Sequence, residues 1–256
     1  MALNNEVNIS VVIITYNEEA CIAACIESVV GIADEILVVD SLSQDNTREI
    51  CRNYDVRFIE NVFPGYIEQK NYATSLAKYD IILSLDADEV LSEVLKEQIR
   101  NVKSNWEADA YAFNRLSSFQ GKWIYHCGWY PDRKIRLFNR RKAHWGGFNP
   151  HDHIIMDDNT RIQLIKQDIL HYPYDSLNEY INKANTFSSI EAQTAFEKGN
   201  NSTVLFHVVL KPFYTFIEKF FIRLGILDGY QGFIISIVSS LGKFLKYVKL
   251  RELNRR

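Results

Sequence analysis

The first ninety residues alternate between short β-branched runs and segments with a helical apolar stripe, and this alternation restricts the fold more than any other feature. Residues 9–15 (ISVVIIT) form a run typical of a strand buried on both faces. Residues 19–30 then carry apolar side chains at helical spacing. The same reasoning predicts strands at 35–40, 56–60 and 80–86, a short helix ending near 54 and a helix at 66–76. Repeated strand–helix units predict an α/β fold with a mostly parallel sheet.

The rest of the chain has a different character. An aromatic-rich region at 111–155 has poor periodicity, which indicates short strands and long loops, and it lies between predicted helices at 92–103 and 176–198. The tail from 203 to 253 is apolar, basic and mainly helical. Interruptions of the tail are expected at Pro212, Gly225, Gly229 and Gly232. We therefore expect a catalytic domain over 1–202 and a helical extension over 203–256.

The net charge of −3 hides an uneven distribution along the chain. From Lys211 onward there are nine Lys or Arg and three acids, a balance of +6, so the first 210 residues carry −9. A basic and apolar tail suits a helix lying on an anionic membrane surface, and packing onto the catalytic domain or another subunit is the alternative. The longest uncharged stretch, 229–242, has 14 residues, which is short of the roughly 20 that a spanning helix needs.

Cysteine usage and the first residues bear on the compartment. The four cysteines include no C-x-x-C pair, which indicates neither a disulfide framework nor a zinc ribbon and fits a reducing environment. Residues 1–8 have no basic region and no apolar core, so we expect a short polar lead-in and not a signal peptide. These features predict a cytoplasmic location.

Polar side chains follow three of the predicted strands where each strand ends. They are Thr15, Asn17 and Glu18 after the first strand, Asp40 after the second, and the Asp86-Ala87-Asp88 group after the fourth. Because the carboxyl ends of parallel strands meet at one edge of a sheet, these groups are expected to share a crevice. For any single position, capping of the next helix is an equally good explanation.

The D-x-D group is the sharpest chemical signal. Two carboxylates just beyond a buried strand can hold Mg²⁺ or Mn²⁺, which prefer oxygen ligands and leave positions open for phosphates. The chain has no G-x-G-x-x-G after its first strand and no G-x-x-x-x-G-K-[ST]. A dinucleotide-binding fold and a P-loop nucleotidase are therefore disfavoured, and no feature points to nucleic acid.

Several of these motifs together resemble glycosyltransferase family 2. The resemblance is carried by SVVIITYNEE at 10–19, VVDS at 38–41 with DNT at 45–47, QKN at 69–71 and LDADE at 85–89. It is strongest to the bacterial branch that adds glucose to the lipopolysaccharide inner core. Features of that branch are His151-Asp152, His171-Tyr172, Lys183 and GILDG at 225–229. The resemblance implies the GT-A fold, which is Rossmann-like, with a mostly parallel sheet flanked by helices and here a helical C-terminal extension.

The resemblance also implies roles for particular residues. Thr15, Asn17 and Glu18 would lie at the nucleoside pocket, and Asp40 would contact the uracil or ribose. Lys70 would lie near the donor, with an exposed helix residue as the alternative. Asp86 would approach the ribose, and Asp88 would reach the diphosphate through Mg²⁺ or Mn²⁺. The implied donor is a nucleotide sugar, UDP-glucose in that branch.

An inverting transferase also needs a base for the acceptor hydroxyl. Asp152 is the candidate, in a position where the suspected branch has Glu. His151 or His153 could instead ligate the metal, and we select Asp88 with His151 as the metal residues. A third interpretation is a Gly-rich loop whose histidines bond only to the nearby backbone.

These inferences predict an inverting hexosyltransferase that acts on a glycolipid such as the lipopolysaccharide core. The enzyme is expected to be peripheral on the inner face of the bacterial cytoplasmic membrane. Two competing functions are a metal-dependent nucleotidyltransferase, which would release pyrophosphate, and a non-catalytic membrane-attached scaffold that binds a sugar nucleotide.

Overall fold

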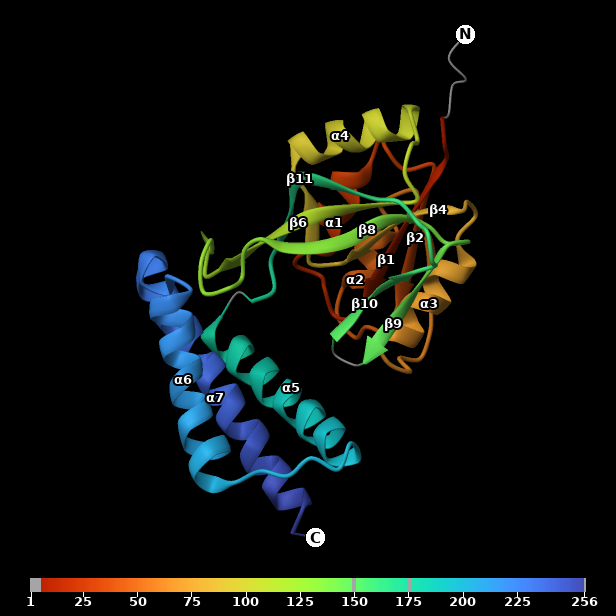
Figure 1. Ribbon diagram of the computed structural model, residues 1–256. Coiled ribbons are helices and arrows are strands. Elements are labelled where there is room, and N and C mark those ends of the chain that lie inside the picture. The colour runs from red at the N-terminus through yellow and green to blue at the C-terminus, as the bar shows by residue number, and fades with distance from the viewer. Residues whose placement is uncertain (1–5, 149–150, 175, 256) are drawn as a thin grey trace. The chain divides into compact units, whose positions relative to one another are not determined.

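The computed structural model describes residues 6–148, 151–174 and 176–255, and of His151 it describes the backbone alone. Two compact units are present (Figure 1). One consists of Met1–Arg115 with Arg133–His171, and the other of Leu116–Asp132 with Tyr172–Arg256. These units are divided at positions other than the predicted boundary between 202 and 203. That boundary was predicted for the catalytic domain, and it stays a prediction.

The N-terminal half of the first unit has the predicted parallel sheet. Strands β1 (Ile9–Thr15), β2 (Glu35–Asp40), β3 (Arg57–Glu60) and β4 (Ile81–Asp86) lie in the order β3-β2-β1-β4. All three pairings among them are parallel. Alternate β1 residues enter separate cores: Val11 and Ile13 join one cluster, and Val12 joins another. Burial on both faces explains why β1 and β4 are nearly uninterrupted apolar runs.

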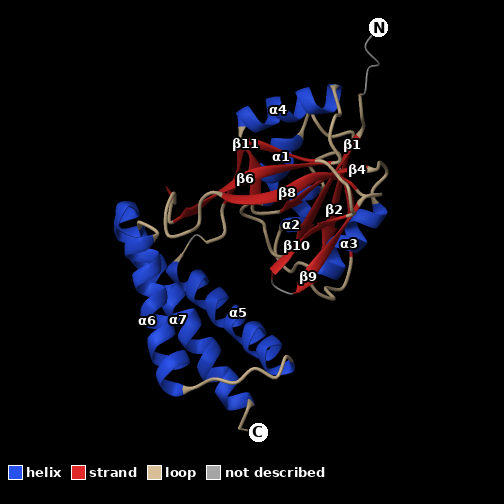
Figure 2. Ribbon diagram, in the orientation of Figure 1, coloured by secondary structure: helices blue, strands red, loops and turns tan. Residues whose placement is uncertain are grey.

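Helices cover both faces of this parallel part (Figures 1 and 2). Helices α1 (Ile22–Val29) and α4 (Glu93–Ser104) supply Ile26 and Leu95 to the core that contains Val11. Helix α3 (Tyr66–Leu76), which has the predicted bounds, supplies Ala73 to the other core. The short α2 (Thr47–Cys51) follows β2. Ser92 caps α4 by accepting the backbone N–H of Leu95, which accounts for the observed start of that helix.

Beyond β4 the sheet becomes mixed. Strand β8 (Asp132–Asn139) pairs antiparallel with β4, and the order continues through β6 (Ala110–Phe119) and β11 (Ile162–His171) to β5 (Glu89–Leu91). The parallel pairings of β1–β4 thus give way to antiparallel pairing at β8, and β11 also pairs antiparallel with β5. The aromatic-rich region lacks a clear period because strands such as β6 are buried on both faces for most of their length. A separate antiparallel hairpin joins β9 (Ala143–Phe148) and β10 (His151–Met156).

The second unit is mainly helical. The tip of β6 pairs with β7 (Lys122–Trp123). Helix α5 (Leu177–Glu197) begins at a capping box made by Ser176 and Glu179, and it packs against α7 (Gly229–Leu253). Between them come four shorter helical segments, η1 (Val204–Leu210), α6 (Lys211–Ile217), η2 (Glu218–Ile222) and η3 (Gly225–Asp228).

The tail breaks at fewer places than predicted. Pro212 lies in the first turn of α6, directly after η1, and the chain stays helical through it. Gly232 lies inside α7. The interruptions at Gly225 and Gly229 are confirmed: η3 begins at Gly225, after Leu224 with a φ of +56°, and α7 begins at Gly229, with a φ of +64°. In the described part of the chain, no single helix is long and apolar enough to cross a membrane. The pair Val204–Ile222 and Gly225–Leu253, bent by 70°, meets the length and composition criteria only when taken together.

Gly232 permits a close backbone approach, and its replacement tests this packing. A Cβ at Gly232 would lie 1.9 Å from the carbonyl oxygen of Gly225, whereas a Cβ at Gly242 in the same helix would meet no atom within 4 Å. We expect Gly232→Ala to lower the free energy of unfolding by about 2–3 kcal/mol through overpacking. The control Gly242→Ala is expected to raise it by about 0.5–1 kcal/mol. Urea unfolding measures both, and equal stability of the two variants would contradict the assigned packing.

Candidate active site

The predicted strand-end residues meet at one edge of the parallel sheet. Thr15 is in register with Asp40 on β2, and Ile14, the residue before it, is in register with Asp86 on β4. The three polar side chains therefore follow neighbouring strands at the same level. Thr15, Asp40 and Asp86 lie at this edge because each strand ends where its apolar run ends.

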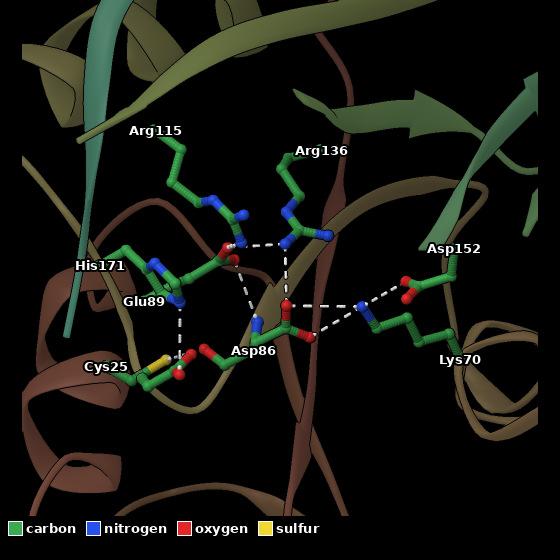
Figure 3. Close-up of polar contacts among 9 residues, drawn as sticks. Cys25, Lys70, Asp86, Glu89, Arg115, Arg136, Asp152 and His171 are labelled. Carbon is green, nitrogen blue, oxygen red and sulfur yellow. Dashed lines mark hydrogen bonds and ion pairs between the residues drawn. The ribbon is translucent and has the colours of Figure 1, made fainter. Parts of the chain in front are cut away.

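Asp86 is held between two cations from different elements (Figure 3). Nζ of Lys70, on α3, lies 3.0 Å from its Oδ1, and Nη2 of Arg136, on β8, lies 2.8 Å from its Oδ2. Burial alone would raise the pKa of Asp86. The charges of Lys70 and Arg136 outweigh burial and hold the pKa well below its usual range. Asp86 is therefore an ionised carboxylate at any physiological pH.

Lys70 joins Asp86 to the predicted base. Its Nζ lies 2.8 Å from Oδ2 of Asp152, which β10 contributes (Figure 3). The Lys70 side chain is only 5 % exposed, so it is not the solvated helix residue of the alternative interpretation. Two acidic groups from distant parts of the sequence thus share one buried ammonium. This ammonium lies at the strand-end edge, as expected for a residue near the donor.

Arg136 and Glu89 form a second buried ion pair beside Asp86. Nη2 of Arg136 lies 2.6 Å from Oε1 of Glu89, and Arg115 approaches the same oxygen at 3.1 Å. The other Glu89 oxygen accepts the backbone N–H of Asp86 at 3.2 Å, so Glu89 fixes both the backbone and a cation partner of Asp86. Burial would lower the pKa of Arg136, but Glu89 and Asp86 outweigh it and raise that pKa.

These two residues were not selected from the sequence. Arg136 belongs to a basic run at 133–142, and solvated side chains are the usual case for such residues, yet the side chain of Arg136 is 4 % exposed. The alternation of basic and apolar residues in 133–138 gives no sign of which arginine faces inward. Trp145 lies against both cations, with its ring centroid 4.4 Å from Nζ of Lys70 and 5.5 Å from Cζ of Arg136.

Asp88, the second carboxylate of the motif, has a histidine partner. Nε2 of His171, at the end of β11, lies 3.4 Å from Oδ2 of Asp88. The register of β11 on β5 places His171 opposite Glu89. The sequence spacing of Asp88 and His171 gives no sign that the two side chains lie close together.

The side chain of His151, the predicted metal ligand, lies outside the described residues, while His153 is exposed on β10. Among the residues that the structure describes, no group of three or more His, Cys, Asp or Glu side chains could hold a metal.

The residues assigned to the nucleoside pocket connect two neighbouring loops. Asn17, with φ of +54°, accepts the backbone N–H of Gln44 at 2.8 Å, and Asp40 accepts that of Ser43 at 2.8 Å. The backbone N–H of Glu18 donates to the hydroxyl of Thr47 at 2.9 Å. These bonds tie the loop after β1 to the loop after β2. The alternative role, capping of the next helix, is not observed, because the N-caps of α1 and α2 make no side-chain cap hydrogen bond. The binding roles stay predictions.

Comparison with known proteins identifies the class. The model of the family "Glycosyl transferase family 2" matches residues 10–163. An uncharacterized glycosyltransferase of Rickettsia typhi is 33% identical over 256 residues, covering 96% of this chain and 87% of the relative. The lipopolysaccharide core biosynthesis glycosyltransferase LpsC of Rhizobium meliloti is 28% identical, covering 95% of this chain and 92% of the relative.

Solved structures agree on the fold. The mannosyltransferase PcManGT from Pyrobaculum calidifontis, in complex with GDP-Man and Mn²⁺, has a TM-score of 0.53 at 13% identity, over 96% of this chain and 87% of its own. Glucosyl-3-phosphoglycerate synthase from Mycobacterium tuberculosis has a TM-score of 0.50 at 16% identity, over 77% of this chain and 82% of its own.

The fold and the family define an enzyme that transfers a sugar from a nucleotide-sugar donor, with a GT-A catalytic fold and a helical C-terminal region. The chain belongs to glycosyltransferase family 2. This assignment confirms the predicted family and enzyme class, and it disfavours the nucleotidyltransferase and scaffold alternatives.

Proposed function

We propose that this enzyme transfers glucose from UDP-glucose to a glycolipid, such as a lipopolysaccharide core, with inversion at the anomeric carbon. The observation that carries the proposal is the Asp86–Lys70–Asp152 arrangement at the strand-end edge of the parallel sheet. The acceptor is supported by the name of the LpsC relative, which matches over most of both chains. With a glycolipid of this kind as the acceptor, we propose that the enzyme acts on the inner face of the cytoplasmic membrane.

In this reaction Asp152 accepts the proton of the attacking acceptor hydroxyl, as a carboxylate within hydrogen-bond reach can do. Lys70 offers its ammonium to the diphosphate and holds Asp152 in place through their 2.8 Å contact. Asp86, which its two cations keep ionised, accepts a hydrogen bond from a ribose hydroxyl.

A divalent cation fits the remaining pair of this site. Asp88 offers a carboxylate, the donor that Mg²⁺ and Mn²⁺ prefer, and the imidazole of His171 lies 3.4 Å from it. This pair leaves coordination positions open for phosphate oxygens. The ion would supply Lewis-acid stabilisation of the leaving diphosphate. His171 is thus proposed as a metal ligand that the sequence analysis did not select, and the predicted role of His151, whose side chain lies outside the described residues, stays a prediction.

A thermal-shift panel of nucleotide sugars, with and without Mn²⁺, tests the donor. A ligand at a hundred times its Kd stabilises the native protein by about 2.7 kcal/mol. For a chain of this size we expect UDP-glucose with Mn²⁺ to raise the Tm by about 5 °C or more. GDP-mannose under the same conditions is the control. A larger Tm shift with GDP-mannose would refute the proposal that UDP-glucose is the donor. A Tm shift with UDP-glucose that is the same with and without Mn²⁺ would refute the proposal that the donor binds with the metal ion.

A further inference from the structure

The segment from Val204 to Leu227 exposes its apolar side chains. Six of the large ones that face solvent are Leu205, Phe206, Phe213, Tyr214, Ile222 and Leu227. Leu205 is 69% exposed and Phe213 is 65% exposed, values that are unusual for side chains of this size on a helix packed against another helix. We call this surface the outer face of the tail.

Several polar groups of the same segment point the other way, toward α7, whereas the side chain of Arg223 is 59% exposed. Nζ of Lys211 donates to the hydroxyl of Tyr247 at 3.0 Å, and Thr215 is buried. Ser240 of α7 donates its hydroxyl to the backbone oxygen of Pro212 at 2.7 Å.

A helix on a water-soluble protein has its apolar stripe inside and its polar face outside. Here Phe216 and Phe220 do contact Phe233 of α7, but large apolar side chains also cover the outside of the segment. An exposed apolar surface of this extent marks a contact with an apolar partner or phase.

The exposed apolar surface continues across the bend. Ile226 in η3 and Tyr230 and Phe233 in the first turns of α7 are also exposed. Apolar side chains are therefore exposed on both arms of the 70° bend. Such an extended apolar region suits a broad apolar phase better than a single narrow helix groove.

Charge selects between the two occupants that could cover this surface. From Lys211 to the end, the chain has nine basic and three acidic residues, a balance of +6. A symmetric contact with a second copy would bring two such basic regions together, which is unfavourable. The headgroups of anionic phospholipids carry the complementary charge and surround an apolar layer.

We propose that the outer face of the tail inserts into one leaflet of a bilayer that contains anionic phospholipids. The inference deepens the proposed function, because it gives the enzyme access to an acceptor held in the membrane. It depends on the exposed side chains and the charge of the second unit, and on no residue of the candidate active site.

Vesicle co-sedimentation of the full chain tests the inference. We expect binding to phosphatidylcholine vesicles to increase when phosphatidylglycerol is added, and to fall with added salt. The double substitution Leu205→Glu with Phe213→Glu should weaken binding at least about tenfold, because it removes two large apolar groups from the contact. Leu205→Ser with Phe213→Ser, which adds no charge, should weaken it in the same direction.

Val94→Glu is the matched control, since Val94 is 58% exposed on α4 of the other unit, and its binding should equal that of the unchanged protein. Unchanged vesicle binding by both double variants would overturn the inference. So would a lipid-independent dimer, detected by sedimentation velocity, that the same substitutions dissociate. Nucleotide-sugar binding is measured on the same samples: vesicle binding without UDP-glucose binding refutes the proposed donor alone, and the reverse result refutes the membrane surface alone.

Discussion

Asp152→Asn is expected to lower kcat by about a thousandfold, within the range for loss of a general base. The substitution keeps the size of the side chain and its contact with Lys70, whose Nζ lies 2.8 Å from Oδ2, but an amide cannot accept the proton. Donor binding should therefore change little. Sugar transfer measured by UDP release in the presence of acceptor gives kcat, and calorimetry gives the donor Kd.

Asp152→Glu is the conservative control. It restores a carboxylate and adds one methylene, so we expect it to retain substantially more activity than the Asn variant. If the Asn and Glu variants are equally impaired, position 152 serves packing or the Lys70 ion pair, and the base lies elsewhere. Full activity of Asp152→Asn would exclude the assignment directly.

Asp88→Ala should reduce kcat by about a hundredfold or more and abolish the effect of Mn²⁺ on donor binding. The reason is the loss of an ionised ligand where negative charge grows on the leaving diphosphate, a stabilisation of several kcal/mol. Its partner His171, 3.4 Å away, cannot hold a divalent ion alone. Activity and thermal shift across a Mn²⁺ titration measure both effects.

Asp158→Ala provides the comparison for this second experiment, because Asp158 is exposed in the turn after β10. It should behave as the unchanged enzyme does at every Mn²⁺ concentration. If the activity and thermal shift of Asp88→Ala still change with Mn²⁺ concentration, the ion is held by other groups.

The sequence was sufficient to predict the parallel half of the fold and the position of its polar edge. Residues 9–15, 35–40 and 66–76 were predicted with their observed bounds, because strand and helix periods are unambiguous there. The positions of Asp40 and Asp86 could be predicted because each is the last residue of a strand with a clear apolar run. In such segments local pattern and tertiary packing agree, which is the condition under which sequence reasoning succeeds.

The charge pairs across the site could not be predicted in this way. Arg136 is one of several basic residues in a strand, and only the antiparallel pairing of β8 with β4 turns it toward Asp86. His171 meets Asp88 through the pairing of β11 with β5. Both contacts depend on strand order in the mixed part of the sheet, and the aromatic-rich sequence of that part contains no period from which the order could be derived.

The discontinuous second unit sets an order of events during synthesis. Residues 116–132 leave the ribosome early, yet Phe119, Ile124 and Cys127 pack with Ile235 and Val238 of α7, about a hundred residues later. The buried carboxylate of Asp228 likewise accepts the backbone N–H of His126 at 2.9 Å. Until the last helix emerges, this apolar cluster has only residues such as Tyr180 of α5 to pack against, while the sheet of the first unit is already complete at His171. A chain shortened before residue 203 would leave the α7 side of the same cluster permanently uncovered.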